Sequence, residues 1–446
     1  MVIGYFSLFD FGIGRALTKL VAEKLGSCQK DELSELIWTA LLVMLILGSF
    51  GGLLSAALTS VLVSSVLKVP EYLLKETSQS FYILSSAIPI VILTTGLRGV
   101  LEAQQRFDLV NMVRIPMGLF TFLAPLLIIP FSTSLTPIII LLVSGRLIFC
   151  IVHYYLCLRV DRDLFKNISF NIKLVSPLLS FGSWITITNI VGPMMVYLDR
   201  FVIGSLLSVS NVAYYATPYE MITKLLLVPS ALVGVLFPVF STGFVQDPQN
   251  ITRVYYNSVK YIYLLLFPII LIVITFSYEI LDLWVGHEFA IHSYRILQWL
   301  ALGVLLNSIA LIPFTFIQGI GRPDITSKFH LIELPLYILV LRYLLLTVGV
   351  DGAAIAWVGR VLLDAVLLFI ATSRLIKLNK HLVEYSIAMA GSVCVSIALA
   401  LLTSIFYKIL FSTSIILSFL VITWIVLLDD SEKSFLKGKL NVIKCF

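Results

Sequence analysis

Long apolar runs recur along the whole 446-residue chain, and short polar segments separate them. A helix needs about 20 mostly apolar residues to cross a bilayer, whereas isolated strands cannot satisfy their backbone hydrogen bonds in lipid. The pattern predicts an all-α, polytopic membrane protein with about 12–13 transmembrane helices. The expected spans are 1–18, 36–66, 78–101, 109–130, 135–158, 176–206, 211–240, 259–278, 294–318, 329–348, 352–373, 384–406 and 409–428.

Lysine and arginine gather in alternate polar segments, which sets an expected orientation. The segments 19–30, 159–173 and 433–444 carry several cations each, whereas 131–134 and 207–210 carry none. Short loops rich in lysine and arginine stay on the cytoplasmic side of the membrane. The alternation therefore predicts a cytoplasmic C-terminus and supports the number of spans.

Composition agrees with this interpretation and excludes other classes. Hydrophobic residues make up 59% of the chain and charged residues 13%, and the mean hydropathy is +1.02. Soluble domains are about 45–50% apolar and about 25% charged. The net charge of +6 comes from scattered loop cations rather than a basic stripe, so nucleic acid is not an expected partner.

Nothing in the sequence indicates catalysis. The five cysteines and five histidines show no metal-ligand spacing, so we expect neither a metal site nor a cofactor. The loops are too short to fold as a catalytic domain, and no nucleophile–base arrangement is evident. The chain is therefore expected not to be an enzyme.

Charged residues inside the apolar runs are the best candidates for function. Asp199 and Arg200 are adjacent in the run 176–206, where each charge costs roughly 2.5–3.5 kcal/mol on insertion scales. Adjacent side chains leave a helix about 100° apart and cannot face each other. Each residue needs its own partner, either on a neighbouring helix or in a polar cavity.

Other charges within the runs have open interpretations. Glu220 and Lys224 are spaced for a pair within one helix, although Arg200 with Glu220, or Asp199 with Lys224, are cross-helix alternatives. Residues near span ends can also extend toward the membrane surface. The full set of expected cavity residues is Arg15, Arg98, Arg146, Asp199, Arg200, Glu220, Lys224, Arg360 and Asp364.

A faint repeat favours two halves of six helices. Arg106 and Asp108 follow one apolar run, and Arg322 and Asp324 follow a comparable run six spans later. Internal repeats of this kind are common in transporters.

Several segments resemble bacterial O-antigen and polysaccharide flippases. The resemblance covers most of the chain and is most specific in the segments 4–23, 97–108, 181–184, 198–204, 214–220 and 236–241. This superfamily also contains multidrug exporters and lipid II flippases. The resemblance implies two six-helix lobes around a central cavity, two additional C-terminal helices and alternating access.

The resemblance also implies a division of the chain. We expect an N-terminal lobe at 1–158, a cytoplasmic linker at 159–175, a C-terminal lobe at 176–377, and two further helices with a cytoplasmic tail at 378–446. Compared with the family, the chain is expected to lack the first helix and part of the second. The expected location is the bacterial cytoplasmic (inner) membrane.

The implied function is translocation of undecaprenyl-diphosphate-linked oligosaccharide, a precursor of O-antigen or another surface polysaccharide. Arginine suits this cargo because guanidinium binds phosphate through two hydrogen bonds and stays charged when buried. Membrane lipids are expected partners, with a polysaccharide polymerase and chain-length machinery as further ones. The alternatives are a cation-coupled multidrug exporter of the same superfamily and, less favoured, an integral membrane enzyme of polysaccharide assembly.

Overall fold

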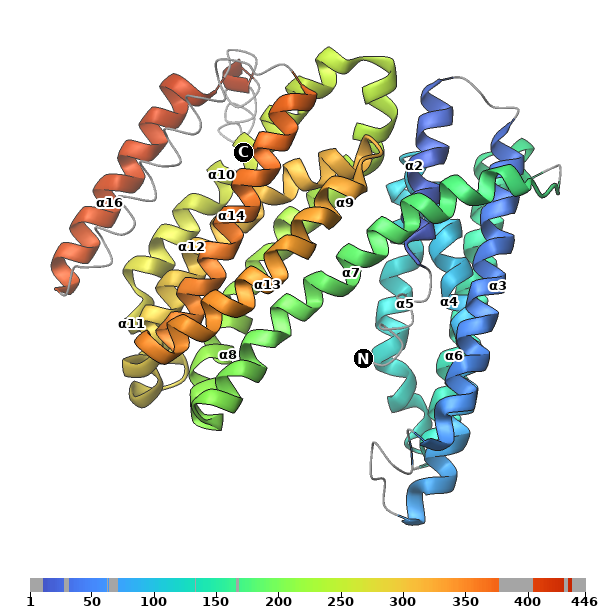
Figure 1. Cartoon of the computed structure of the whole chain (residues 1–446), viewed down its shortest axis with the longest axis horizontal. Helices are drawn as coiled ribbons and strands as arrows, with labels where there is room; N and C mark the ends of the chain where they lie inside the picture. Colours follow the sequence, from blue (N-terminus) through green and yellow to red (C-terminus); the bar gives the residue numbers. More distant parts are fainter. Residues whose placement is uncertain are drawn as a thin grey trace, which may run out of the picture. The chain divides into compact units, whose positions relative to one another are not determined.

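All regular structure in the described part of the chain is helical, which confirms the predicted all-α class (Figure 1). The computed structural model describes residues 11–27, 32–61, 63, 71–132, 134–165, 168–376, 404–428 and 432–434. The long helices are α2 (Ile13–Gly26), α3 (Leu33–Val61), α4 (Leu74–Ala103), α5 (Phe107–Ile128), α6 (Leu135–Val160), α7 (Ile172–Leu206), α8 (Val209–Thr223), α9 (Leu227–Gln246), α10 (Pro248–Thr275), α12 (His287–Gly319), α13 (Pro323–Val348), α14 (Asp351–Leu375) and α16 (Ile405–Ile422). Shorter elements are α11 (Ser277–Trp284), the 3₁₀ turns η4 (Glu71–Leu73), η5 (Asp163–Phe165) and η6 (Lys224–Leu226), and the π-turn η7 (Thr423–Leu427).

Within the described residues, 11 helical segments are long and apolar enough to cross a membrane. Of the predicted spans, 384–406 lies almost entirely outside the described residues, as do the first ten residues of 1–18. The segment 211–240 is confirmed as one span, but it is interrupted by η6.

The predicted starts are wrong for two helices that begin in polar sequence. The span expected at 259–278 begins at Pro248, and the one expected at 294–318 begins at His287. The Asp247 carboxylate caps α10 by accepting the backbone N–H of Asn250 at 3.1 Å, and proline is favoured at the first helical position. Hydropathy misses such turns because capping, rather than apolar burial, stabilises them.

The chain divides into two compact units. Unit 1 contains Met1–Pro193, Gly234–Ile251 and Thr315–Lys328, and unit 2 contains Met194–Val233, Thr252–Phe314 and Phe329–Phe446. Several long helices contribute residues to both. The lobe boundaries expected from the sequence stay a prediction, and the two units are described separately below.

In unit 1, helices α3, α4, α5 and α6 run side by side (Figure 1). Glycines allow α3 and α4 to approach closely. A Cβ atom on Gly48 would lie 2.8 Å from the Pro89 Cα, and one on Gly52 would lie 2.8 Å from the Ser85 carbonyl oxygen. Small residues four apart are typical of membrane helix interfaces, where association depends on close van der Waals contact. This spacing explains why the two helices share a long interface.

The turns α4–α5 and α12–α13 have the same local geometry. The Arg106 N–H donates to the Leu101 carbonyl at 3.0 Å, and the Arg322 N–H donates to the Ile317 carbonyl at 3.0 Å. The residue before each arginine has a positive φ, 58° in one turn and 92° in the other. A helix C-terminus commonly ends in this left-handed conformation.

Each arginine in these turns also binds the aspartate two residues later. Arg106 donates to Asp108 at 2.9 and 2.8 Å, and Arg322 donates to Asp324 at 3.0 and 3.3 Å. These hydrogen bonds raise the pKa of both arginines because they stabilise the charged guanidinium. The two segments that match in sequence thus also match in side-chain and backbone geometry, while the six-helix repeat stays a prediction.

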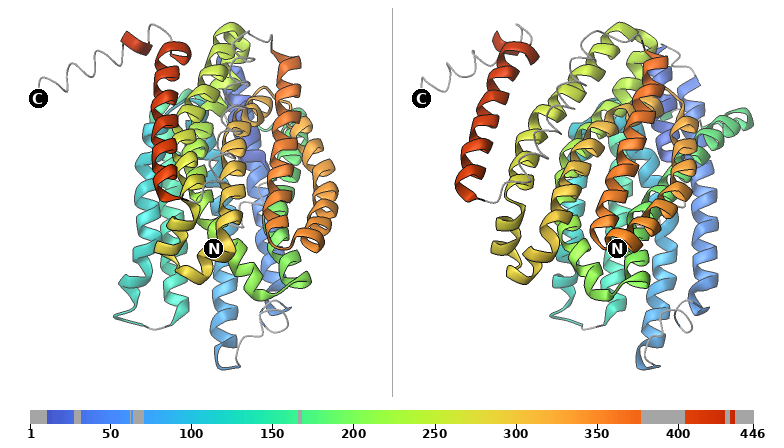
Figure 2. Two further views of the ribbon diagram at one scale, coloured as in Figure 1. Left: turned by 90° about the vertical axis from the view of Figure 1, so that its left-hand side faces the viewer. Right: turned by 60° about the vertical axis from the view of Figure 1, so that its left-hand side comes forward.

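In unit 2, α13 and α14 form an antiparallel pair joined by a short turn (Figure 2). Two ion pairs attach the helix α16 to the rest of this unit, and the α16 side contributes the cation to one pair and the carboxylate to the other. Lys408 near the start of α16 binds Glu279 of α11 at 2.8 Å, and Glu432 beyond its end binds the buried Lys260 of α10 at 2.8 Å. Between them, Phe419 packs on α10 with its ring 4.8 Å from that of Phe267. Both ends of α16 are therefore fixed against α10 and α11.

Candidate functional site

Unit 2 contains a fully buried carboxylate, that of Asp199. Asp199 of α7 accepts a hydrogen bond from the Tyr215 hydroxyl of α8 at 2.5 Å, and another from the Arg200 backbone N–H at 2.7 Å. An unpaired carboxylate in apolar surroundings would cost several kcal/mol, so these donors are needed to keep it there. Its side-chain partner is Tyr215, so the alternative that pairs Asp199 with Lys224 is wrong.

Arg200 has a separate partner, as its helical geometry predicts. Its Nη1 lies 3.2 Å from the Glu220 Oε1, and its guanidinium carbon lies 5.2 Å from the Tyr219 ring centre. Glu220 is well exposed, so the ion pair adds little stability. The cross-helix alternative is confirmed, whereas the described chain shows no Glu220–Lys224 ion pair. Lys224 is exposed at the start of η6.

Arg360 of α14 lies among groups from two other helices. Its Nη1 is 3.8 Å from the Glu333 Oε2 on α13 and 3.9 Å from the Met195 sulfur on α7, and its guanidinium lies 5.8 Å from the Tyr337 ring centre. The ion pair of Arg360 is made with Glu333, whereas Asp364, which is spaced for a pair within α14, interacts with Arg360 through charge. An aromatic face and one carboxylate thus stabilise this cation.

Three potential ligands gather beside Arg360. The imidazole of His330 and the carboxylates of Glu333 and Asp364 have ligand atoms within 4.8 Å of one another, and all three residues are at least nine-tenths buried. Two carboxylates this close repel each other in an apolar environment, and Arg360 offsets one charge. A bound proton or small cation would stabilise the remaining charge. This group fits proton or cation binding, whereas the sequence predicts no metal site.

Aromatic side chains join these charged groups into one site. Tyr215 stacks on Tyr219 at 5.8 Å between ring centres, and Tyr219 meets the edge of Trp357 at 5.7 Å. We call the whole set the unit 2 polar cluster. Its members are Asp199, Arg200, Tyr215, Tyr219, Glu220, His330, Glu333, Tyr337, Trp357, Arg360 and Asp364.

The cluster unites five of the nine residues expected to line a cavity. The sequence also contained a signal for Glu333, a lone carboxylate in an apolar run. Tyr215 and Tyr219 fall in the segment 214–220 that resembles the flippases, and a histidine such as His330 is itself rare inside an apolar run. The sequence contained no signal for Tyr337, whose partners lie on distant segments. Sequence spacing therefore identified the charges but not the aromatic groups that hold them.

The three remaining arginines of the expected set lie in unit 1 and do not gather there. The Arg15 Nη1 donates to the Gln318 side chain at 3.2 Å, and its guanidinium lies 5.9 Å from the Phe237 ring centre. Arg98 pairs within α4 with Glu102 at 3.2 Å, and Arg146 lies 3.4 Å from the Met117 sulfur. Their role in a cavity stays a prediction.

Comparison with solved structures identifies the fold. The fold is that of multidrug and toxin extrusion (MATE) transporters, membrane proteins with two helical lobes. One structure in a bent conformation has a TM-score of 0.74 over 89% of this chain and 87% of that protein, at 14% identity. An outward-facing multidrug resistance MATE transporter has a TM-score of 0.70, also at 14% identity. Similarity at this identity shows the fold alone.

Sequence comparison identifies the family. The family described as "Polysaccharide biosynthesis protein" matches residues 7–293. The "Putative O-antigen transporter" of Shigella flexneri is 30% identical over 368 residues, 82% of this chain and 86% of that protein. The lipopolysaccharide biosynthesis protein WzxC of Escherichia coli K12 is 23% identical over 74% of this chain and 64% of that protein. The chain belongs to this family of O-antigen and polysaccharide flippases.

Proposed function

We propose that this protein transfers lipid-diphosphate-linked oligosaccharide from one leaflet of the membrane to the other, by alternating access. The observation that carries the proposal is the 30% identity to the O-antigen transporter over most of both chains. A third relative, named as a probable low-salt glycan biosynthesis flippase of Haloferax volcanii, is 28% identical over 41% of this chain and 39% of that protein.

The chemistry of the unit 2 polar cluster supports this cargo. Arg200 and Arg360 are permanently charged, can bind phosphate through two hydrogen bonds, and are stabilised by tyrosine rings. Glu220 and Glu333 partly neutralise them, which would keep binding of a diphosphate weak enough for release. A carrier needs this balance because tight binding would trap the substrate.

The group formed by His330, Glu333 and Asp364 is the candidate for energy coupling. A proton or cation that enters this group removes the repulsion between its carboxylates. The same event changes the net charge beside Arg360, which is 3.8 Å from Glu333. Coupling through this contact would let ion binding and substrate release alternate.

We further propose that the chain lies in the cytoplasmic membrane of a bacterium with its C-terminus in the cytoplasm. The supporting observation is the alternation of cation-rich and cation-free loops. The protein acts as a transporter rather than as an enzyme, and a polymerase that consumes the transferred units is the partner expected at the outer leaflet.

The test is disruption of the gene in a strain without a second flippase. The expected result is loss of surface polysaccharide and accumulation of lipid-linked units in the cytoplasmic leaflet, both restored by the wild-type gene. Normal surface polysaccharide in the disruptant would refute the proposal. Purified protein in vesicles separates the alternatives: leaflet transfer without a new covalent product supports a flippase, whereas a covalent product supports an enzyme. Efflux of organic cations instead would support the multidrug alternative.

A further inference from the structure

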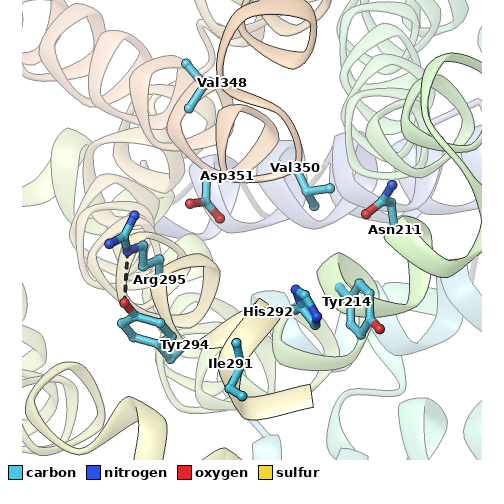
Figure 3. A pocket seen from close by; sticks show the side chains of 9 residues that line it. All are labelled: Asn211, Tyr214, Ile291, His292, Tyr294, Arg295, Val348, Val350 and Asp351. Atoms are coloured by element: carbon cyan, nitrogen blue, oxygen red, sulfur yellow. Dashed lines mark hydrogen bonds between the residues drawn. The ribbon is translucent and has the colours of Figure 1, made fainter. Parts of the chain in front are cut away.

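Unit 2 contains a polar pocket, and none of its lining residues belongs to the unit 2 polar cluster (Figure 3). Its lining residues come from α8, the first turns of α12 and the α13–α14 turn. Its volume is about 420 Å³, which falls within the roughly 300–1,000 Å³ of small-molecule sites. Its polar and aromatic lining consists of Asn211, Tyr214, His292, Tyr294, Arg295 and Asp351.

An aromatic platform forms one wall of this pocket. The Tyr214 ring lies 4.7 Å from the His292 ring and 5.0 Å from the Phe289 ring, measured between centres. The Tyr214 carbonyl also accepts a hydrogen bond from the Ser293 hydroxyl at 2.9 Å. These contacts hold the tyrosine between α8 and α12, so a ligand that stacks on it would lose little affinity to side-chain ordering.

Hydrogen-bonding groups of both kinds surround the platform. Figure 3 shows the Asp351 carboxylate, the Arg295 guanidinium and the Asn211 amide around one opening. The Arg295 Nε donates to the Tyr294 hydroxyl at 3.0 Å, which leaves its terminal nitrogens available for a ligand. Arg295 and Asp351 attract each other by charge, but they form no direct ion pair in this described region.

An aromatic ring surrounded by both hydrogen-bond donors and acceptors favours one class of ligand over others. A sugar ring has apolar C–H faces that pack on aromatic rings, and hydroxyl groups that need both donors and acceptors. Arg295 and Asp351 carry opposite charges, so the pocket offers no net charge that favours an organic cation or a free diphosphate. A neutral or weakly charged saccharide uses all the groups present.

We propose that this pocket binds the saccharide portion of the transported molecule. The inference rests on the proposed function, and on the proposed orientation, which places the cation-free loops 207–210 and 349–351 on the external side. The pocket is then a holding site for the sugar after it has crossed the membrane. It is distinct from the arginines that suit the diphosphate.

Binding is tested on the full chain in lipid nanodiscs with a water-soluble probe. The probe is the repeat-unit oligosaccharide that mild acid releases from the producing strain's lipid-linked precursor, which lacks both lipid and diphosphate. Saturation-transfer NMR is expected to show transfer to the sugar C–H protons. Tyr214→Ala should weaken binding about threefold to tenfold, the effect of losing one aromatic contact, whereas Tyr214→Phe should retain it.

The matched control is Tyr343→Ala, which removes an exposed tyrosine of α13 that does not line the pocket. Unchanged melting temperatures confirm that each variant is folded. The proposal is overturned if wild-type protein does not bind the oligosaccharide, if Tyr214→Ala binds as tightly as wild type, or if pyrophosphate displaces the oligosaccharide.

Transport is measured separately, so the two proposals can fail independently. If wild-type protein transfers the lipid-linked unit but does not bind the free oligosaccharide, the pocket assignment fails while the proposed function stands. If it binds the oligosaccharide through Tyr214 but transfers no lipid-linked unit, the proposed function fails and the pocket remains a saccharide site.

Discussion

The ion pair between Arg360 and Glu333 gives the most direct test of the unit 2 polar cluster. The Arg360 Nη1 lies 3.8 Å from the Glu333 Oε2, and Glu333 is almost completely buried. Coulomb's law with an effective dielectric constant of about 20 assigns this contact ~4 kcal/mol. Removal of one partner from a buried pair typically costs about 3–5 kcal/mol, because the other charge is left uncompensated. Arg360→Met keeps much of the side-chain volume and should destabilise the protein by this amount.

The assay is the apparent melting temperature of the purified protein. At roughly 2.1 cal/mol/K of unfolding entropy per residue, the 446 residues convert ~4 kcal/mol into a decrease of about 4 °C. The double variant Arg360→Met with Glu333→Gln should recover most of this loss, because it removes the unpaired charge as well as the cation. The control is Arg342→Met, which changes an exposed arginine on the same helix as Glu333.

Two results would refute this reasoning. The first is an Arg360→Met variant that melts together with the wild type, which would mean that the cation does not stabilise Glu333. The second is a double variant no more stable than Arg360→Met, which would trace the loss to packing rather than to charge.

Three further predictions concern transport and packing. Arg200→Ala should lower transfer of the lipid-linked unit roughly 10- to 100-fold, the effect of losing a charge-assisted hydrogen bond, while the amount of protein in the membrane stays normal. Equal loss of protein and of transfer would show a structural role. The control is Arg374→Ala, at the exposed end of α14. Gly52→Val should reduce the folded yield in size-exclusion chromatography, because the added Cβ would lie 2.8 Å from the Ser85 carbonyl oxygen. Gly118→Val should be tolerated, because a Cβ added there meets no atom of another residue within 4 Å. Lys408→Met should lower the melting temperature because it leaves the α11 glutamate without its 2.8 Å partner, and a reversed pair at the two positions should restore it; failure of the reversal would argue against an ionic contact.

Much of the membrane architecture could be predicted from local sequence. Apolar runs of bilayer length leave no alternative to helices, because lipid offers the backbone no hydrogen-bond partners. The predicted starts were wrong at α10, because the Asp247 cap and Pro248 extend the helix into polar sequence. Capping depends on a single side chain and does not register in a hydropathy average.

The separation of Asp199 from Arg200 was also predictable, because helical geometry alone forbids their contact. Their partners were only partly predictable, because spacing offered Glu220 as one alternative for Arg200, whereas Tyr215 was not among the expected partners of Asp199. Spacing left two cross-helix pairings open, Arg200 with Glu220 and Asp199 with Lys224, and the structure contains the first of them.

The sequence by itself determined the helical class, the approximate positions of the spans and the charges that must be satisfied within them, because each depends on residues close together in the chain. Only the tertiary structure decided which groups satisfy those charges. His330, Glu333 and Asp364 meet through the packing of α13 against α14, and the sugar-sized pocket needs residues from four helices. Such sites depend on distances between segments far apart in the chain, and no local pattern encodes those distances.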